Sequence, residues 1–437
     1  MKRILFIVFF VISNCVFGQD SMTFNDCLAI TLKNNLALKS ALNDEQIALY
    51  QYKTSYGNLL PSVFATVDNK NSWGRDIDSK TNLYVNKDLK SYTGSLGATY
   101  NLFSGFAVIN SIKSAKQGFR INTINVQKVK NEITIDLAEK FITILYLQEV
   151  IAANKEQITS SEKQLELAIL KFNSGVIAES EVFKIKSQKA NEELILLTNQ
   201  NHLADNFINL KQLMNISLEK EIKLVKPELT LNENLELKEN QYSLTNKAVE
   251  INPSYLMSLL KEKKARTELS ISRAALYPTL SMRLSYGSNF NNSEPLVPNK
   301  DQIDSNVSKA MRFTLVIPIF SQLDNYSRIK TSKFNYKQSK INTQIVQNQL
   351  SKEVLKAITD TKTSVKKNES SAIAYEFSQK SYEADALKFE LGKININELN
   401  TSKTIFNNSQ AELIQSKYEL LFNNALIKFY LGEEFSL

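Results

Sequence analysis

The chain repeats itself at a fixed spacing, and this feature constrains its fold more than any other. Pro61 and Pro278 stand 217 positions apart. The same offset relates further residues: Asn35 and Asn252, Glu45 and Glu262, Phe103-Ser104 and Phe320-Ser321, Lys171-Phe172 and Lys388-Phe389, Gly175 and Gly392, Glu181 and Glu398, and Asn206 and Asn423. The sequence is therefore a tandem duplication of residues 27–215 and 244–432. Each half far exceeds a solenoid repeat of about 20–50 residues, so the halves predict a pseudo-symmetric oligomer wall or a two-domain protein.

Few residues in the chain interrupt regular structure. It holds only 11 Gly and 7 Pro in 437 residues, and these two residue types are the main breakers of helices and strands. Residues 106–172 contain no proline and only Gly118, and residues 325–389 contain neither type. A helix of that length would span about 100 Å. No globular core covers such a helix, so the sequence predicts long helices packed side by side as coiled coils.

The N-terminus has the pattern of a secretory signal peptide. Lys2 and Arg3 precede the apolar run 4–12, and Gly18 offers a small-residue exit. Residues 1–18 are therefore expected to be removed. Lipidation of Cys15 is not expected, because Asn14 stands where such sites need Gly or Ala. Cys27 then remains as the one thiol of an exported chain, which predicts a fold stabilised by packing rather than by a disulfide.

Each half predicts the same order of elements: helix, strand, loop, strand, very long helix, tight turn and helix. The first half, 19–216, would hold a β-hairpin at 62–103 and a helical hairpin at 106–214. A linker at 217–241 joins it to the second half, 242–437, with a β-hairpin at 279–320 and a helical hairpin at 322–431. The first helices are expected at 24–58 and 244–276, each ending just before its proline, Pro61 or Pro278.

After each proline the hydrophobic pattern changes from helical to alternating. Apolar positions 280, 282, 284 and 286 alternate with Ser281, Arg283 and Ser285, and residues 92–102 repeat the pattern. One apolar face and one polar face over about 9–11 residues are typical of transmembrane β-strands. A half-buried hairpin on a helical core gives the same alternation, so the strands alone leave both possibilities open. The polar loops expected at 68–91 and 289–308 favour the membrane barrel.

Glycines mark the turns of the two helical hairpins. Gly175 follows Phe172-Asn173-Ser174, and Gly392 follows Phe389-Glu390-Leu391. A glycine just past the last apolar residue is typical of a helix end with a left-handed cap. The second helices are expected at 179–214 and 396–431.

These motifs, in the same order twice, resemble the TolC-like outer-membrane efflux proteins over nearly the whole mature chain. The resemblance rests on the duplicated helix–proline–strand pattern, the strand-to-helix junctions 101–105 and 318–321, and the glycine turns. It implies a mainly α fold of tandem-duplicated long α-hairpins, a coiled-coil α-barrel, with four transmembrane strands per chain. Four strands cannot close a barrel alone, since single-chain barrels begin at eight; the family's homotrimer closes a 12-stranded barrel in the outer-membrane lipid.

The resemblance also implies a function, a location and partners. The protein would be the outer-membrane channel of a tripartite efflux pump or type I secretion system in a Gram-negative bacterium. Its helical part would cross the periplasm to a periplasmic adaptor, or membrane fusion, protein and an inner-membrane transporter. Drug, metal and protein export all remain open, because a wide water-filled tunnel has little selectivity of its own.

Candidate functional residues follow from the same resemblance. Glu398 matches a position where family members present a ring of carboxylates at the closed periplasmic end, and Glu181 is its counterpart in the first half. A helix N-terminal Glu that favours the helix dipole is the alternative interpretation. Polar locking residues of the family are replaced by Phe389, Ile394 and Thr401, which suggests an apolar constriction. The turns expected to meet the adaptor are Ser174-Gly175-Val176 and Leu391-Gly392-Lys393.

The residue content argues against other functions. His202 is the only histidine, and no metal-ligand cluster or phosphate-binding glycine loop occurs in the sequence, so no enzyme activity, cofactor or metal is expected. The formal charge of +8 is spread between carboxylates along helical faces, which does not predict nucleic-acid binding. A periplasmic coiled-coil adaptor or scaffold without a pore is the main alternative. It would explain the signal peptide and the helical hairpins, but not the four symmetrically placed strands.

Overall fold

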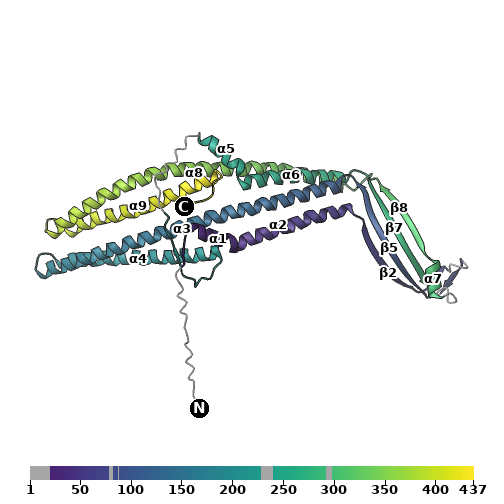
Figure 1. The fold of residues 1–437 in the computed structure, drawn as a ribbon, viewed down its shortest axis with the longest axis horizontal. Helices are drawn as coiled ribbons and strands as arrows, with labels where there is room; N and C mark the ends of the chain where they lie inside the picture. Colours follow the sequence, from purple (N-terminus) through teal and green to yellow (C-terminus); the bar gives the residue numbers. More distant parts are fainter. Residues whose placement is uncertain (1–19, 78–81, 87, 228–239, 292–297) are drawn as a thin grey trace, which may run out of the picture. The chain divides into compact units, whose positions relative to one another are not determined.

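The computed structural model describes residues 20–77, 82–86, 88–227, 240–291 and 298–437. The expected signal peptide, with Cys15, lies outside these residues, as does part of the predicted linker. The chain divides into two compact units, which we describe separately (Figure 1). The helical unit comprises residues up to Lys39, Val129–Val249 and Ser351–Leu437; the sheet unit comprises Ser40–Lys128 and Glu250–Leu350.

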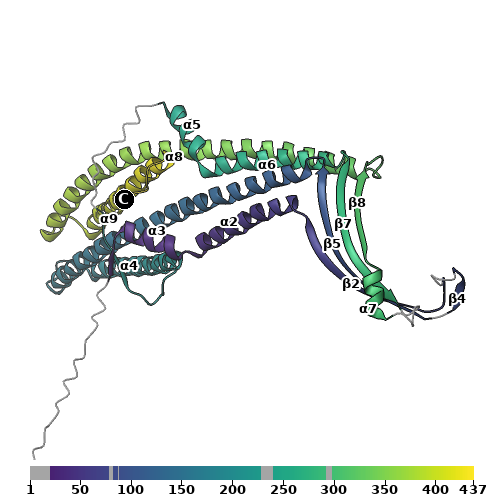
Figure 2. The same cartoon turned by 45° about the vertical axis from the view of Figure 1, so that its right-hand side comes forward.

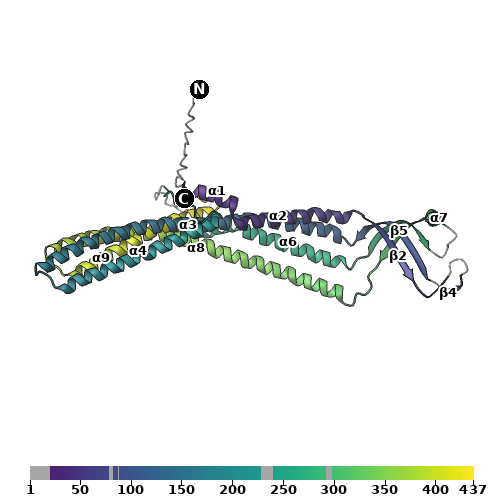
Figure 3. The ribbon, with the colours of Figure 1, turned by 90° about the horizontal axis from the view of Figure 1, so that it is seen from below.

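Two helical hairpins make up most of the helical unit. The first joins the later part of α3 (Ala107–Asn173) to α4 (Glu179–Met214), and the second joins the later part of α8 (Asp324–Glu390) to α9 (Ile396–Tyr430). The two hairpins lie side by side (Figures 1 and 3). The long helices have 67 residues each and the shorter ones 36 and 35. The predicted long helices and their glycine turns are therefore confirmed.

The core of the helical unit brings together segments that are far apart in sequence. A short parallel pair joins β1 (Asp20–Met22) to β6 (Ile222–Leu224), next to α1 (Phe24–Asn34). Phe24 packs edge-on against Phe141 of α3 and also contacts Phe435 near the chain end. All three aromatic side chains lie in one buried cluster with residues of α4 and α9. A further cluster packs α5 (Gln241–Ile251) against α8 and α9.

The sheet unit is built around one four-stranded antiparallel sheet, in the order β2-β5-β7-β8 (Figure 2). Its strands are β2 (Ser62–Ser72), β5 (Leu89–Ser104), β7 (Thr279–Asn291) and β8 (Ser308–Val316). The central pair, β5 and β7, joins the hairpin of the first half to that of the second. The unit also contains α2 (Leu36–Ser55) from Ser40 onward, the 3-10 turn η1 (Tyr56–Leu59), α6 (Pro253–Ala274) and the first parts of α3 and α8.

The register of this sheet separates an apolar face from a polar one. Val63, Ala98, Leu284 and Met311 lie opposite one another across the four strands. On the other face, one row contains Ser62, Thr99, Arg283 and Arg312, and the next contains Phe64, Gly97, Ser285 and Ala310. Both edge strands are largely exposed in the single chain. The predicted alternation is therefore present in the folded strands, and it continues across the boundary between the two halves.

Both helices predicted before the prolines are broken. The first helix divides into α1 and α2 at Asn35, whose Oδ1 accepts from the N–H of Leu38 and whose Nδ2 donates to the carbonyl of Leu213. The second divides into α5 and α6 at Asn252, where Pro253 is the first residue of α6. Proline has no N–H to donate and is favoured at a first helical position. The asparagines repeated at an offset of 217 therefore mark breaks in both predicted helices.

The predicted loops contain regular structure as well. β2 reaches Ser72 and β7 reaches Asn291, and the segments beyond hold a small hairpin of β3 (Arg75–Ile77) with β4 (Tyr84–Asn86) and the helix α7 (Asn299–Ser305). The strand β6 lies in the predicted linker, whose residues 228–239 fall outside the described part of the chain. Pro61 stands between η1 and β2, and Pro278 between α6 and β7. None of the helices in the described residues is long and apolar enough to cross a membrane.

Candidate functional site at the ends of the helical hairpins

The two hairpin turns have the same backbone geometry. Gly175 and Gly392 have φ angles of 73° and 70°, in the left-handed region that disfavours other residues. In each turn the glycine N–H donates to a carbonyl three residues back, and the next N–H donates to a carbonyl five residues back. These bonds satisfy carbonyls at the end of the long helix. A Cβ at either glycine would meet open space, so the requirement for glycine lies in the backbone.

The tips of both turns are open to solvent. Val176 is 65% exposed and Leu391 is 70% exposed, and Ser174 and Lys393 are exposed beside them. Ser174 Oγ donates to the carbonyl of Leu170 at 2.8 Å. Each hairpin therefore presents one large apolar side chain at its end.

Glu398 lies in the first turn of α9 and is exposed. Asn395 caps this helix, because its Oδ1 accepts from the N–H groups of Asn397 (2.9 Å) and Glu398 (3.1 Å). Asn395 Nδ2 in turn donates to Glu398 Oε1 at 2.6 Å. The carboxylate thus takes part in capping and still faces solvent, so a capping role and a role at an opening are compatible.

The other predicted gate residues differ in their surroundings. Thr401 is exposed one turn after Asn397, and Ile394 is half-buried. Phe389 is only 3% exposed and packs in a cluster with Ala168, Val182, Ile185, Ile396 and Leu399. The prediction that Phe389 forms a constriction is corrected, since this side chain lies in the core that joins the two hairpins. Glu181 is half-buried at the start of α4, whose N-cap residue, Ala178, provides no side-chain cap.

Lys171 connects the ends of the two hairpins. Its Nζ donates to the carbonyls of Phe389 (2.6 Å) and Glu390 (3.0 Å) at the end of α8. The ammonium also lies 4.7 Å from the centre of the Phe389 ring. A cation at this place satisfies free carbonyls and interacts favourably with the negative end of the helix dipole. The last turn of α3 thereby holds the last turn of α8.

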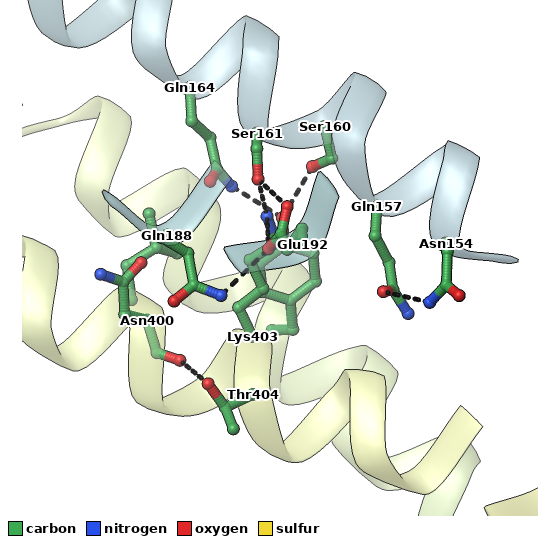
Figure 4. A network of polar contacts seen from close by, with 12 residues as sticks. Asn154, Gln157, Ser160, Ser161, Gln164, Gln188, Glu192, Asn400, Lys403 and Thr404 are labelled. Atoms are coloured by element: carbon green, nitrogen blue, oxygen red, sulfur yellow. Dashed lines mark hydrogen bonds and ion pairs between the residues drawn. The ribbon is translucent and has the colours of Figure 1, made fainter. Parts of the chain in front are cut away.

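A buried ion pair ties the hairpins together further along (Figure 4). Lys403 of α9 lies 2.9 Å from Glu192 of α4, and the two side chains are 2% and 4% exposed. Lys403 donates to Ser161 of α3, and Ser161 donates to Glu192. Gln188 Nε2 also donates to Glu192, at 3.1 Å. Burial lowers the pKa of Lys403, and the adjacent Glu192 opposes this change.

A second polar contact lies beside this pair. Gln164 Nε2 donates to Tyr382 Oη at 2.7 Å, and Ser160 shares a hydrogen bond of 2.9 Å with the same hydroxyl. These bonds join α3 to α8. The interface between the two hairpins is therefore held by polar groups from all four helices as well as by its apolar cluster.

Sequence reasoning did not identify Lys403 and Glu192, because charged residues in a long helix usually face solvent. A signal was nevertheless present in the apolar stripe. Lys403 follows the buried Ile396 and Leu399 by seven and four positions, and Glu192 follows the buried Ile185 by seven. Both charges thus occupy positions of the helical repeat that normally carry apolar residues.

A third polar cluster anchors the segment that follows β6. Glu149 of α3 accepts from Lys226 (2.8 Å), Tyr418 (2.8 Å) and Lys417 (3.3 Å). Burial raises the pKa of Glu149, but the hydrogen bonds and charges of these partners outweigh it, so the pKa lies below its ordinary value. Burial and the same carboxylate raise the pKa of Tyr418.

The remaining chemistry-bearing residues of the described segments are not gathered into one cluster. His202 is exposed on α4, and the part of the chain that the structure describes contains no group of His, Cys, Asp and Glu suited to a metal ion. Cys27 is buried, and burial raises its pKa to about 11. Pro61 and Pro278 lie in the sheet unit and are not part of the hairpin ends.

Comparison with known proteins assigns the fold. Solved structures similar to this chain include CusC, with a TM-score of 0.83 at 13% identity, covering 95% of this chain and 93% of CusC. The Campylobacter jejuni CmeC outer membrane channel gives a TM-score of 0.83 at 16% identity, with coverages of 94% and 85%. The Neisseria gonorrhoeae MtrE outer membrane channel gives 0.74 at 16% identity, with coverages of 94% and 88%. The predicted fold class, that of TolC-like α/β-barrel channels, is confirmed.

The family follows from the sequence itself. No curated protein matches the chain. A family model described as outer membrane efflux protein matches residues 28–215 and 244–433, which are the two repeats. The protein is the outer-membrane channel component of a tripartite efflux system, with its helical part in the periplasm, and the family and fold are those of channels rather than enzymes. Because the model covers both repeats almost completely, the chain belongs to the outer membrane efflux protein family.

Proposed function

We propose that three copies of this chain close a 12-stranded barrel and a helical tunnel, and that this trimer receives cargo from a periplasmic adaptor and an inner-membrane transporter. The observation that carries the proposal is the four-stranded sheet, which ends in two edge strands, β2 and β8. Open edges invite pairing with another chain. One chain falls short of the eight strands of the smallest barrels, two would leave an interior filled by side chains, and three leave room for a pore.

The two faces of the sheet support a place in the outer membrane. The apolar row of Val63, Ala98, Leu284 and Met311 would face lipid, and the row with Ser285 would face the bore. Val63 and Met311 are 66% and 63% exposed in the single chain. Exposed apolar side chains at both edges of the sheet are covered once lipid and neighbouring copies surround them.

The periplasmic opening would be set by the start of α9. Three copies of Glu398 around one axis would form an anionic ring that attracts cations and selects against anions. Ile394 and Thr401 flank this ring, while the buried Phe389 supports it from within the protomer. Glu181 is a weaker candidate, because it is half-buried in the single chain.

The hairpin turns would meet the adaptor. Val176 and Leu391 offer one exposed apolar side chain each, held in place by a glycine turn. A bulky residue in place of Gly392 should abolish transport and leave trimers in the membrane. Loss of the trimers would assign the glycine a folding role instead.

Purified protein tests the trimer and the pore directly. Native mass spectrometry in detergent should give a complex of three chains, and outer membranes should retain it through a high-salt wash. Planar bilayers containing the protein should show cation-selective channels. A monomer in detergent, or a trimer that conducts no ions, would exclude the proposal.

A further inference from the structure

The buried lysine pocket of the helical unit has a repeat counterpart. At the offset of 217 residues, Lys403 corresponds to Lys186, Ser161 to Ser378, and Glu192 to Ser409. The first pocket lies on the α3–α4 hairpin and is filled by a lysine of α9 in the same chain. Its counterpart lies on the α8–α9 hairpin, where Ser378 and Ser409 share a hydrogen bond.

The lysine that matches this second pocket is exposed. Lys186 lies on α4, and its ammonium stands 5.7 Å from the ring centre of Phe183, itself 55% exposed. Ser378, by contrast, is 8% exposed. Within one chain, the α3–α4 hairpin therefore presents an exposed lysine. The α8–α9 hairpin presents two serines, at the repeat positions of Ser161 and Glu192.

Phe377, which precedes Ser378, is a large apolar side chain that is exposed in the single chain. Ser160, which hydrogen-bonds Tyr382 between the hairpins, corresponds to Phe377, and Tyr382 corresponds to Leu165. Phe377 is 62% exposed in the single chain. If a second copy packs as the two hairpins pack within one chain, Leu165 of that copy covers Phe377. The hydrogen-bonded pair Ser160 and Tyr382 within one chain would then correspond to an apolar contact of Phe377 with Leu165 between copies.

We propose that Lys186 of one copy docks against Ser378 and Ser409 of the next copy, in the way that Lys403 docks within its own chain. This inference rests on the proposed trimer and specifies its contact between copies. The occupant is a second copy because the duplication supplies both halves of the contact, one on each hairpin. The internal interface gives the template for the geometry.

The two kinds of interface differ in one charge. The pocket within the chain holds Glu192, whereas the pocket between copies holds Ser409 at that position. Two hydroxyls can accept hydrogen bonds from an ammonium but bring no opposite charge. A desolvated ammonium without a carboxylate is less stable than a paired one. We therefore expect the contact between copies to separate more easily than the contact between the two hairpins of one chain.

A cross-link tests the contact. Lys186→Cys and Ser409→Cys are combined in one chain, and the trimer is treated with a short bismaleimide. Cys27 does not compete, because it is fully buried and its raised pKa keeps the thiol protonated. Dimers and trimers on a denaturing gel are expected. The single variants Lys186→Cys and Ser409→Cys, each with one half of the proposed contact, should stay at the mass of a monomer.

A charge installed at Ser409 tests the energetic difference. Ser409→Glu should raise the temperature at which trimers dissociate in detergent by several degrees, whereas Ser409→Gln should not. Adding Lys186→Met to Ser409→Glu should remove the gain. An intact trimer that yields no linkage between copies and responds equally to Glu and Gln would overturn the contact. Absence of a trimer in the unmodified protein would instead refute the proposed function, so the two failures are distinguishable.

Discussion

Lys171, in the last turn of α3, caps the end of α8. Its Nζ donates to the carbonyl of Phe389 at 2.6 Å and lies over the ring of the same residue. The contact links the two repeats at their matching ends, because Lys171-Phe172 and Lys388-Phe389 are repeat equivalents. One residue thus orders the turn that carries Leu391 and Gly392. The same turn leads into α9, whose first turn carries the candidate gate residue Glu398.

Replacing Lys171 with Met should loosen the end of α8. The substitution removes two charge-assisted hydrogen bonds, a loss of about 1 to 2 kcal/mol, while keeping most of the aliphatic stem. Amide hydrogen exchange over residues 385–393 should become faster. Lys380→Met is the matched control, since Lys380 contacts the exposed Glu376 and the ring of Phe377, both on its own helix. Equal exchange in the two variants would contradict the capping role.

Replacing Gly392 with Val should strain the second hairpin turn. The φ angle of 70° costs an ordinary residue about 1 to 2 kcal/mol, and β-branching adds to the cost. Gly392→Asn should be milder, because Asn tolerates the left-handed region. Thermal unfolding of the two variants measures the difference. If Val and Asn destabilise the protein equally, the backbone argument is wrong.

The charge of Glu398 should control cation binding at the proposed opening. Glu398→Gln keeps an acceptor for Asn395 Nδ2 and so preserves the cap, but it removes the anionic ring. Single-channel recordings should show weaker block by polyvalent cations and lower cation selectivity. Glu433→Gln, at an exposed site near the chain end, should leave both unchanged. Unaltered block in Glu398→Gln would remove this residue from the gate.

Glu149 should make the stability of the helical unit depend on pH. Its pKa in the folded chain lies below the ordinary value of 4.5, so its ionised form contributes stability above about pH 4.5, and this contribution is lost as the pH falls through the folded-state pKa. Glu149→Gln should cost about 1 kcal/mol at pH 7.

Melting temperatures of the wild type and Glu149→Gln between pH 7 and pH 3 provide the measurement. The difference should be full at neutral pH and should shrink in acid, because the wild-type carboxyl becomes protonated there. A difference that stays constant over this range would show that Glu149 does not act through its charge.

Local patterns were enough to predict the elements of the fold. Gly175 and Gly392 permit a left-handed turn just past the end of a helix, and Pro61 and Pro278 disfavour continuation of a helix. The alternation around Arg283 could be read as a strand without knowledge of its neighbours. The breaks at Asn35 and Asn252 were missed. Pro253 was a readable signal for the second, because proline is favoured at the first position of a helix, whereas the first is revealed only by the contacts of Asn35.

The candidate site was predicted in part. The turns and Glu398 lie at the hairpin ends because sequence order alone places them there. The burial of Phe389 could not be predicted, since it depends on how two hairpins from different halves of the chain pack. The same holds for the pocket of Lys403, because periodicity shows that a charge lies on the apolar stripe but not which partner faces it.

The sequence by itself determined the duplication, the long helices with their turns and the amphipathic strands, because these follow from residue spacing along one segment. Only the tertiary structure decided the pairing of Lys403 with Glu192, the parallel joining of β1 to β6 and the packing of Phe435 against Phe24. Each of these brings together residues from distant segments. Such contacts are selected by the total free energy of packing and desolvation, which no local pattern contains.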